Sequence, residues 1–309
     1  SAPDVVMYYK NGTKFIVSFK YSNGTGIAGE KVGININGVT YYRTTDTNGE
    51  AKLNINLDSG VYPIYVELIN SSYGKYNATA TVTVLSTIYG NDTVLYYRNG
   101  TKYNALFLDG QGNPLKNAKV SFNINGVMYE RITDENGMTS GLSINLRPGT
   151  YIITATHPNG EKHSNNITVI ATLITDDLTK YYKNGSQFNL RLVDGQGNGI
   201  EGETITFNIN GVFYTKVTGK DGYATLNINL AALNGETTEY IITSYYKDYS
   251  VGNKVTVLPV ITGENGIIGR GSTFDAKVVD GNGVAQADVP VTFNIHGIFY
   301  HKTSDINGL

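Results

Sequence analysis

The chain has no cysteine among its 309 residues, which excludes disulfide bonds, thiol catalysis and cysteine-based metal sites. It has no tryptophan and no run of eighteen or more apolar residues, so we expect no membrane-spanning helix in this stretch. No charged segment followed by an apolar one opens the sequence, so we expect any signal peptide or anchor to lie outside it. Core packing must therefore hold the fold, unless an uncommon covalent cross-link replaces cystines.

Charge is also scarce. Only 16% of the residues are charged, and 24 basic against 26 acidic side chains give a net charge of −2. Nucleic-acid binding needs clustered Lys and Arg to neutralise phosphates, so this composition argues against a nucleic-acid partner. Neutral polar groups dominate instead, with 34 Asn, 34 Thr, 16 Ser and 24 Tyr. Such a surface stays hydrated without strong fields, which suits an extracellular or cell-surface location.

An internal repeat is the main feature that is present. The phrase YYKNG at 8–12 returns as YYRNG at 96–100, as YYKNG at 181–185 and as IIGRG at 267–271, in steps of 88, 85 and 86 residues. The glycines of the ININGV, FNINGV and FNIHGI phrases, and a third column of glycines, move by the same steps: Gly38, Gly126, Gly211 and Gly297, then Gly49, Gly137, Gly222 and Gly308. Whole units of about 86 residues were therefore duplicated.

Each unit shows short alternating strands separated by turn signals. In AKVSFNI, Val120, Phe122 and Ile124 share one face of a predicted strand. Asn125-Gly126 follows, and this pair tolerates the positive φ of a type I′ turn, so residues 127–133 should fold back as the antiparallel partner. A second turn at 134–137 leads into the remaining strands. Seven strands with frequent turns predict an all-β immunoglobulin-like sandwich.

Two details favour a sandwich. Tyr62 and Tyr151 each lie five residues after a leucine at the start of the sixth strand, where sandwiches often use a tyrosine to tie down the neighbouring loop. In the third unit the corresponding Tyr240 follows a longer segment, AALNGETTE, so the extra length is expected in a loop.

The predicted domains are a first repeat at 1–87, a second at 88–173, a third at 174–259 and an incomplete fourth at 260–309. No Gly/Ser-rich or Pro-rich linker separates them, so we expect limited swing and an elongated, semi-rigid rod. The fourth repeat lacks its last three strands, and we expect residue 309 to be a fragment boundary.

The repeats resemble the bacterial-Ig-like repeats, of the invasin and intimin type, found in adhesin-like surface proteins of methanogenic archaea. The residues that carry the resemblance are the phrase at 114–137 with the tail INLRPGTYIITA at 144–155, and the phrase at 199–222. The resemblance covers the whole chain and implies an exported protein that attaches to cells or surface polysaccharide, either as the adhesin or as its stalk. It implies no enzymatic activity and no cofactor.

Two other classes stay open. The chain could be a spacer or carbohydrate-binding array of a secreted enzyme, or a viral or appendage fibre subunit. The enzyme hypothesis expects a non-repeated segment with clustered acids elsewhere, and the adhesin hypothesis expects more repeats and an anchor. A hydrolase needs a unique constellation of residues, whereas nearly every polar motif here recurs as a turn.

Tyrosines are the first candidates for ligand contact. The recurring pairs at 8–9, 96–97 and 181–182 could form an aromatic platform, but core packing is the better interpretation, because one member of each pair points inward and residues 267–268 replace the pair with isoleucines. Tyrosines outside the repeat pattern are better candidates, and these are Tyr245, Tyr246 and Tyr249 in SYYKDY, with Tyr73 and Tyr76 in the first repeat.

Asparagine sequons are the second group of candidates. Asn11, Asn99 and Asn184 occupy one turn column, and we expect a turn to present its amide for N-glycosylation. Asn77 and Asn166 are further possible N-glycosylation sites.

Metal sites and cross-links have weaker support. DGQGN at 109–113 and 194–198 lacks the further oxygen ligands of a calcium loop and is predicted to be a turn. No pair of the four histidines has ligand spacing with carboxylate support. Arg98 cannot supply the amine of an isopeptide bond in its column, whereas Lys31 and Lys119 are not excluded.

Overall fold

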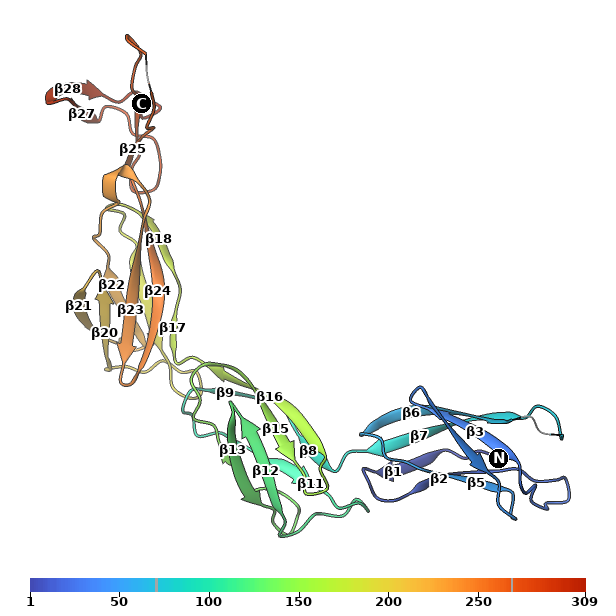
Figure 1. Ribbon diagram of the computed structural model, residues 1–309. Coiled ribbons are helices and arrows are strands. Elements are labelled where there is room, and N and C mark those ends of the chain that lie inside the picture. Colours follow the sequence, from blue (N-terminus) through green and yellow to red (C-terminus); the bar gives the residue numbers. More distant parts are fainter. Residues whose placement is uncertain (70–71, 268) are drawn as a thin grey trace. The chain divides into compact units, whose positions relative to one another are not determined.

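The computed structural model describes residues 1–69, 72–267 and 269–309. Contacts divide the chain into two compact units, one of Ser1–Leu95 with Gly100–Val169 and one of Tyr96–Asn99 with Ile170–Leu309. Strands dominate both units, and the one helical element in the described residues is the short 3₁₀ turn η1, Leu233–Gly235 (Figure 1). The repeat boundaries remain predictions, and the terms first to fourth repeat denote the predicted residue ranges.

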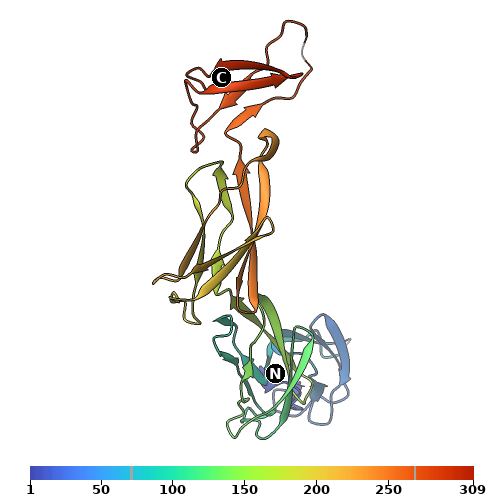
Figure 2. The same ribbon diagram turned by 90° about the vertical axis from the view of Figure 1, so that its left-hand side faces the viewer.

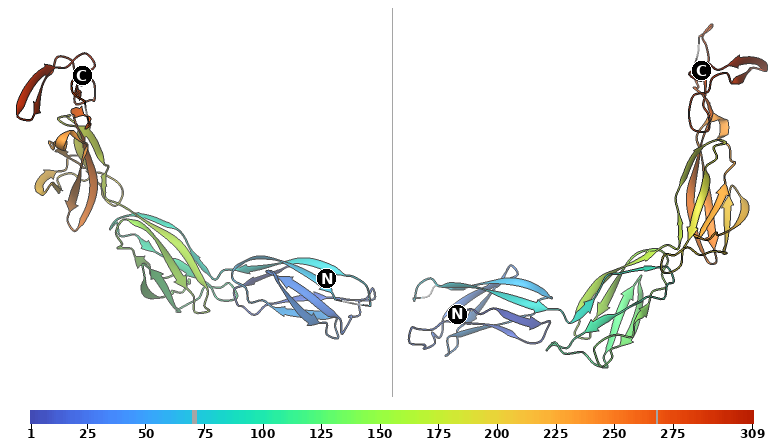
Figure 3. Two further views of the ribbon diagram at one scale, coloured as in Figure 1. Left: turned by 45° about the horizontal axis from the view of Figure 1, so that its top comes forward. Right: turned by 180° about the vertical axis from the view of Figure 1, so that it is seen from behind.

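In the first unit, the first repeat forms two facing sheets. Its five-stranded sheet has the order β1-β7-β6-β3-β4, and β2 pairs with β5 opposite. The long strands β6 and β7 pair along almost their full length (Figure 3). The strands are β1 Val5–Tyr8, β2 Lys14–Ser18, β3 Lys31–Ile36, β4 Val39–Thr44, β5 Glu50–Asn54, β6 Gly60–Leu68 and β7 Asn77–Leu85.

The second repeat has the same arrangement, with a sheet of order β13-β12-β15-β16-β9 opposed by the pairs β8 with β11 and β10 with β14. Its strands are β8 Ile88–Gly90, β9 Thr93–Tyr96, β10 Lys102–Tyr103, β11 Ala105–Phe107, β12 Lys119–Ile124, β13 Val127–Ile132, β14 Leu142–Ser143, β15 Gly149–Thr156 and β16 Lys162–Ile170.

In the second unit, the third repeat has sheets of order β18-β24-β23-β20-β21 and β17-β19-β22. Its longest strands, β23 and β24, lie side by side as the orange ribbons of Figure 2. The strands are β17 Leu173–Thr175, β18 Leu178–Tyr181, β19 Gln187–Leu192, β20 Thr204–Ile209, β21 Val212–Val217, β22 Tyr223–Asn227, β23 Thr238–Tyr246 and β24 Tyr249–Leu258. In the fourth repeat, β25 Ile261–Gly263 pairs with β26 Ala276–Val278, and β27 Pro290–Ile295 pairs with β28 Ile298–Thr303.

This topology is that of tandem immunoglobulin-like sandwiches. The third, sixth and seventh strands of a repeat share one sheet, as in the CFG sheet of immunoglobulin domains, and the fourth strand extends that sheet at its edge. The all-β, tandem immunoglobulin-like fold predicted from the sequence is therefore confirmed.

The opening strand differs from the seven-strand prediction because it is divided between the two sheets. In the third repeat, β17 pairs antiparallel with β19, and β18 then pairs parallel with β24. An aspartate lies at the crossing in three repeats: Asp4, Asp92 and Asp177 accept hydrogen bonds from the backbone N–H groups of Thr81, Asn166 and Lys254 at 2.7, 2.8 and 2.9 Å. The carboxylate satisfies a donor of the last strand where the opening strand begins to pair with it.

The central hairpin is as predicted. Asn125 and Gly126 have φ values of 51° and 76°, the two positive values of a type I′ turn. Strands β12 and β13 pair antiparallel on either side of it. Phe122 is fully buried, and the alternate residues of β12 point into the core.

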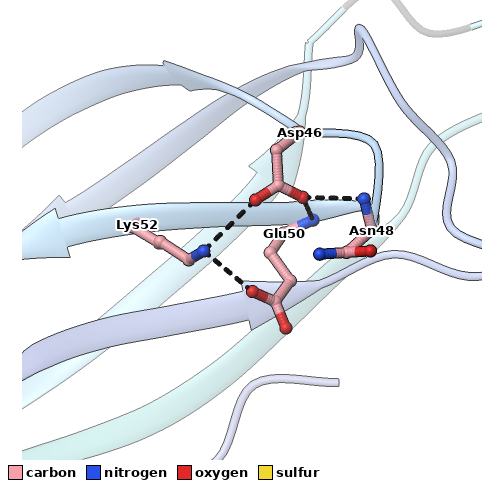
Figure 4. Close-up of polar contacts among 4 residues, drawn as sticks. All are labelled: Asp46, Asn48, Glu50 and Lys52. Atoms are coloured by element: carbon pink, nitrogen blue, oxygen red, sulfur yellow. Dashed lines mark hydrogen bonds and ion pairs between the residues drawn. The ribbon is translucent and has the colours of Figure 1, made fainter.

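The Asp-x-x-Gly turn is held by its aspartate. In the first repeat, Oδ1 of Asp46 accepts the backbone N–H groups of Asn48 and Glu50 at 2.9 and 3.0 Å (Figure 4). Its Oδ2 lies 3.2 Å from Nζ of Lys52, which also pairs with Glu50. Asp109 in the DGQGN segment likewise accepts two backbone N–H groups of its own loop, so that segment is the predicted turn.

The tyrosine at the start of the sixth strand ties down the preceding loop in three repeats. The hydroxyls of Tyr62, Tyr151 and Tyr240 donate to the carbonyls of Asp58, Arg147 and Ala231 at 2.9, 2.8 and 2.7 Å. The third repeat keeps the bond although its loop is longer and contains η1. The added residues therefore lie outside the packed sheets, as predicted.

Candidate functional site

The turn joining the sixth and seventh strands differs in sequence between the repeats, and we call it the last hairpin. It lies between β6 and β7 in the first repeat, between β15 and β16 in the second, and between β23 and β24 in the third. Because the sheets on either side fix where this turn protrudes, its residues can vary without disturbing the core.

The last hairpin of the first repeat carries Tyr73 and Tyr76, whose side chains are 43% and 57% exposed. The hydroxyls of Tyr73 and Tyr21 are 2.7 Å apart and share a hydrogen bond, and the two rings meet edge to face at 5.6 Å. Tyr21 comes from the loop after β2, so two loops distant in sequence form one aromatic surface. The hydrogen bond to Tyr73 raises the pKa of Tyr21.

A groove of 540 Å³ lies beside this aromatic surface, a volume typical of small-ligand sites. Tyr76 contributes to it together with one acid and one base, Glu67 and Lys75. Aromatic faces, phenol hydroxyls and one charge of each sign suit a hydroxylated, largely neutral ligand such as a sugar. The full lining is Tyr65, Glu67, Leu68, Ile69, Gly74, Lys75, Tyr76 and Asn77.

The last hairpin of the second repeat carries polar side chains that are buried and hydrogen-bonded to one another and to neighbouring backbone groups. Asn159 donates its backbone N–H to Nδ1 of His157 at 2.9 Å, so Nε2 carries the proton that is donated to the carbonyl of Leu108. Burial lowers the pKa of His157, consistent with this neutral ring. Oε2 of Glu161 accepts both the N–H and the hydroxyl of Thr87, at 2.7 and 2.5 Å. This hairpin therefore fastens Thr87, immediately before β8, and its polar groups are largely taken up by these contacts.

The last hairpin of the third repeat holds the SYYKDY tyrosines. Tyr245 is 39% exposed, whereas Tyr246 and Tyr249 pack against the core of the repeat. Tyr249 also contacts Tyr97, with ring centroids 5.3 Å apart. Of this set, Tyr245 is the side chain best placed to meet a ligand.

An ion pair closes one side of this hairpin. Nη2 of Arg98 lies 2.6 Å from Oδ2 of Asp248, and Nη1 reaches Oδ1 at 3.1 Å, which is the bidentate geometry of a strong pair. A cavity of 250 Å³ lies between the turn at 96–99 and the hairpin. Its lining is Tyr97, Arg98, Thr172, Val193, Asp194, Gly195, Ile200, Tyr246, Lys247, Asp248 and Tyr249.

The predicted N-glycosylation sites fall into two groups. Asn77 and Asn166 are exposed on strands β7 and β16. Asn11, Asn99 and Asn184 are half-buried, and the side-chain amides of Asn99 and Asn184 donate to the carbonyls of Gly195 and Gly281 at 3.4 and 2.6 Å. The amides of Asn99 and Asn184 are thus hydrogen-bonded to a neighbouring loop, and N-glycosylation of the turn column stays a prediction.

The recurring tyrosine pairs divide between two environments. Tyr9 lies within the first core and Tyr182 packs against the third, so the core-packing interpretation holds for these members. Tyr8, Tyr96 and Tyr181 are half-buried.

Cross-link candidates from the sequence do not lie in a dry core. Lys31 and Lys119 are exposed, and Lys119 pairs with Glu130 at the surface. The buried lysine is Lys180, whose Nζ donates to the carbonyls of Ser186 and Ile228 at 2.9 Å each. Burial lowers its pKa. No motif within a single repeat predicts the burial of Lys180. Comparison of the repeats does indicate it, because the apolar residues Met7 and Leu95 occupy its position in the first two repeats.

Among the described residues, no group of three or more His, Cys, Asp or Glu side chains could hold a metal ion, and no helix is long and apolar enough to cross a membrane.

No protein-family model matches the chain. Solved structures similar to it include a Ca²⁺-stabilized adhesin with which an Antarctic bacterium binds ice, at 19% identity over 98% of this chain and 86% of that chain, with a TM-score of 0.21. An I-band fragment of titin matches at 14% identity, 84% and 96% coverage and a TM-score of 0.23. Invasin, a bacterial integrin-binding protein, matches at 17% identity, 84% and 59% coverage and a TM-score of 0.24. These neighbours are adhesins and arrays of immunoglobulin-like domains, and at these TM-scores the likeness carries no argument about function.

Proposed function

We propose that the chain is a non-enzymatic, extracellular part of a cell-surface adhesin or its stalk, which mediates or presents attachment to surface polysaccharide or to a surface protein of another cell. The resemblance of its repeats to archaeal adhesin-like proteins supports this role. The contact surface we propose is the last hairpin of the first repeat, where Tyr73, Tyr76 and Tyr21 gather.

One observation carries the proposal. The recurring residues form cores, turns and the exposed fourth strand, whereas the exposed tyrosines of the last hairpins occur where the repeats differ. In the first repeat they adjoin a groove of 540 Å³. A purely structural spacer needs no such difference between its copies. Tyr245 in the third repeat is a second, smaller contact.

The alternative is a carbohydrate-binding or spacer array of a secreted enzyme, or a fibre subunit. The same groove would serve a carbohydrate-binding array, so the cellular target separates these classes.

The test is binding of the full 309-residue chain to a glycan array and to whole cells. Tyr76→Ala should weaken binding about five-fold or more, the loss of about 1 kcal/mol that marks an energetically important contact. Tyr42→Ala is the matched control, since Tyr42 lies in the same repeat with 55% exposure against 57% for Tyr76, outside the groove. Equal binding by both variants would reject the groove as the contact, and an absence of binding to glycans and cells would leave the chain as a stalk.

A further inference from the structure

Two recurring motifs contact each other between successive repeats. One is the turn Tyr-Tyr-x-Asn at 8–11, 96–99 and 181–184, which we call the donor turn. The other is the Gly-x-Gly loop at 110–112, 195–197 and 281–283, which we call the acceptor loop. In each case the donor turn of one repeat packs against the acceptor loop of the next, and both members fall within one compact unit.

The second glycine of each acceptor loop lies against a tyrosine ring. A Cβ added at Gly112 would lie 2.5 Å from the ring of Tyr8. A Cβ at Gly283 would lie 2.7 Å from a ring carbon of Tyr181, and one at Gly197 would lie 2.8 Å from the hydroxyl oxygen and 3.2 Å from a ring carbon of Tyr96. The tyrosine is therefore seated where glycine leaves room, and these glycines also have the positive φ that their own turns require.

The first glycine of each loop lies against the asparagine. A Cβ at Gly195 would overlap the Cβ of Asn99 and lie 2.9 Å from its Cα, which cannot rotate away. At Gly281 the Cα of Asn184 is 3.2 Å from the added Cβ, and Nδ2 of Asn184 donates to the Gly281 carbonyl at 2.6 Å. Each asparagine thus packs on the loop, and two of them are hydrogen-bonded to it.

The loop itself does not demand glycine at this first position. Gly110, Gly195 and Gly281 do not have positive φ. In the first repeat, Ser22 occupies the position equivalent to Gly110, since Lys20 bridges Gly26 as Leu108 bridges Pro114. A side chain is therefore compatible with the fold of the loop. We attribute the glycine at the other three positions to the close approach of the neighbouring donor turn.

We infer that the donor turn and the acceptor loop are a matched joint, and that the partner of each Tyr-Tyr-x-Asn turn is the next repeat of the same chain. The joint formed by residues 96–99 is reinforced by the Arg98–Asp248 ion pair and the Tyr97–Tyr249 contact. Both motifs therefore recur, because a repeat between two others contacts the preceding repeat through its acceptor loop and the following repeat through its donor turn. This inference does not rest on the proposed function.

The test adds a single methyl group at the joint. Because the chain lacks cysteine, Phe213→Cys and Phe299→Cys, both at exposed positions of one compact unit, can carry spin labels for distance measurement by pulsed electron paramagnetic resonance. Gly281→Ala places a Cβ 3.2 Å from the Cα of Asn184 and should replace a single narrow distance distribution by a broad one. Gly252→Ala adds the same methyl group in the third repeat where nothing lies within 4 Å, and it should leave the distribution unchanged.

The outcomes separate as follows. A folded Gly281→Ala protein with the unaltered distribution overturns the joint, as does a broad distribution in the chain without the alanine. If Gly281→Ala prevents folding, Tyr181→Ala decides, since it removes the ring seated against Gly283 without adding atoms. Broadening supports the joint, and an unchanged distribution refutes it.

Discussion

Replacing Gly126 with valine tests whether backbone strain alone governs the central hairpin. Gly126 has φ of 76°, and a Cβ added there would find nothing within 4 Å. The Cβ of valine would therefore meet no steric clash, and we expect the main cost to be that of the left-handed conformation, about 1–2 kcal/mol. That loss corresponds to a factor of about 5–30 in the opening equilibrium.

Gly137 provides the contrast, because it combines strain with a clash. Its φ is also 76°, but a Cβ there would overlap the carbonyl oxygen of Phe107 and lie 3.1 Å from the nitrogen of Leu115. Adding about 1–3 kcal/mol for overpacking gives about 2–5 kcal/mol for Gly137→Ala. Gly126→Asn should cost less than about 0.5 kcal/mol, since asparagine visits this conformation readily.

Hydrogen exchange measured by mass spectrometry on the full chain is the assay. Peptides from 119–132 report the altered hairpin, and peptides from 204–217 in the third repeat are the internal reference. We expect exchange in 119–132 to quicken in the order Gly126→Asn, Gly126→Val, Gly137→Ala. Equal effects of Asn and Val at position 126 would refute the strain argument.

Three further predictions follow from individual contacts. Tyr151→Phe should cost about 0.5–1.5 kcal/mol through the lost hydrogen bond to the preceding loop, read as faster exchange of the sixth strand; unaltered exchange would contradict this role. The hydrogen bond from the backbone N–H of Asn166 lowers the pKa of Asp92. The Asp92 carboxylate therefore stabilises the folded state at pH values above its unfolded pKa, and this stabilisation is lost as the pH falls through the lower folded pKa. Between pH 7 and pH 3, the melting temperature of Asp92→Asn should therefore fall less than that of the unaltered chain. An identical dependence of the two melting temperatures on pH would refute the assignment. Glycopeptide mapping should find Asn99 and Asn184 unmodified while exposed Asn77 is available, whereas full occupancy of the first two would show that their amides are free.

The candidate site was only partly predictable. Tyr73, Tyr76 and Tyr245 stand out in the sequence because they interrupt the repeat. Tyr21 did not stand out, because its partner Tyr73 is 52 residues away and only the packing of two loops brings the hydroxyls together. The Arg98–Asp248 pair joins residues 150 apart and leaves no periodic signal.

The sequence by itself determined the class of fold and the local turns. Alternating burial, Asn-Gly and Asp-x-x-Gly are short-range patterns, and their physics is complete within a few residues, as the φ values of Asn125 and Gly126 show. Tertiary structure alone decided that the opening strand divides between two sheets, and that the amide of Asn184 faces Gly281 rather than solvent. Those outcomes depend on groups far apart in the chain, whose contact is set by packing and not by local conformational preference.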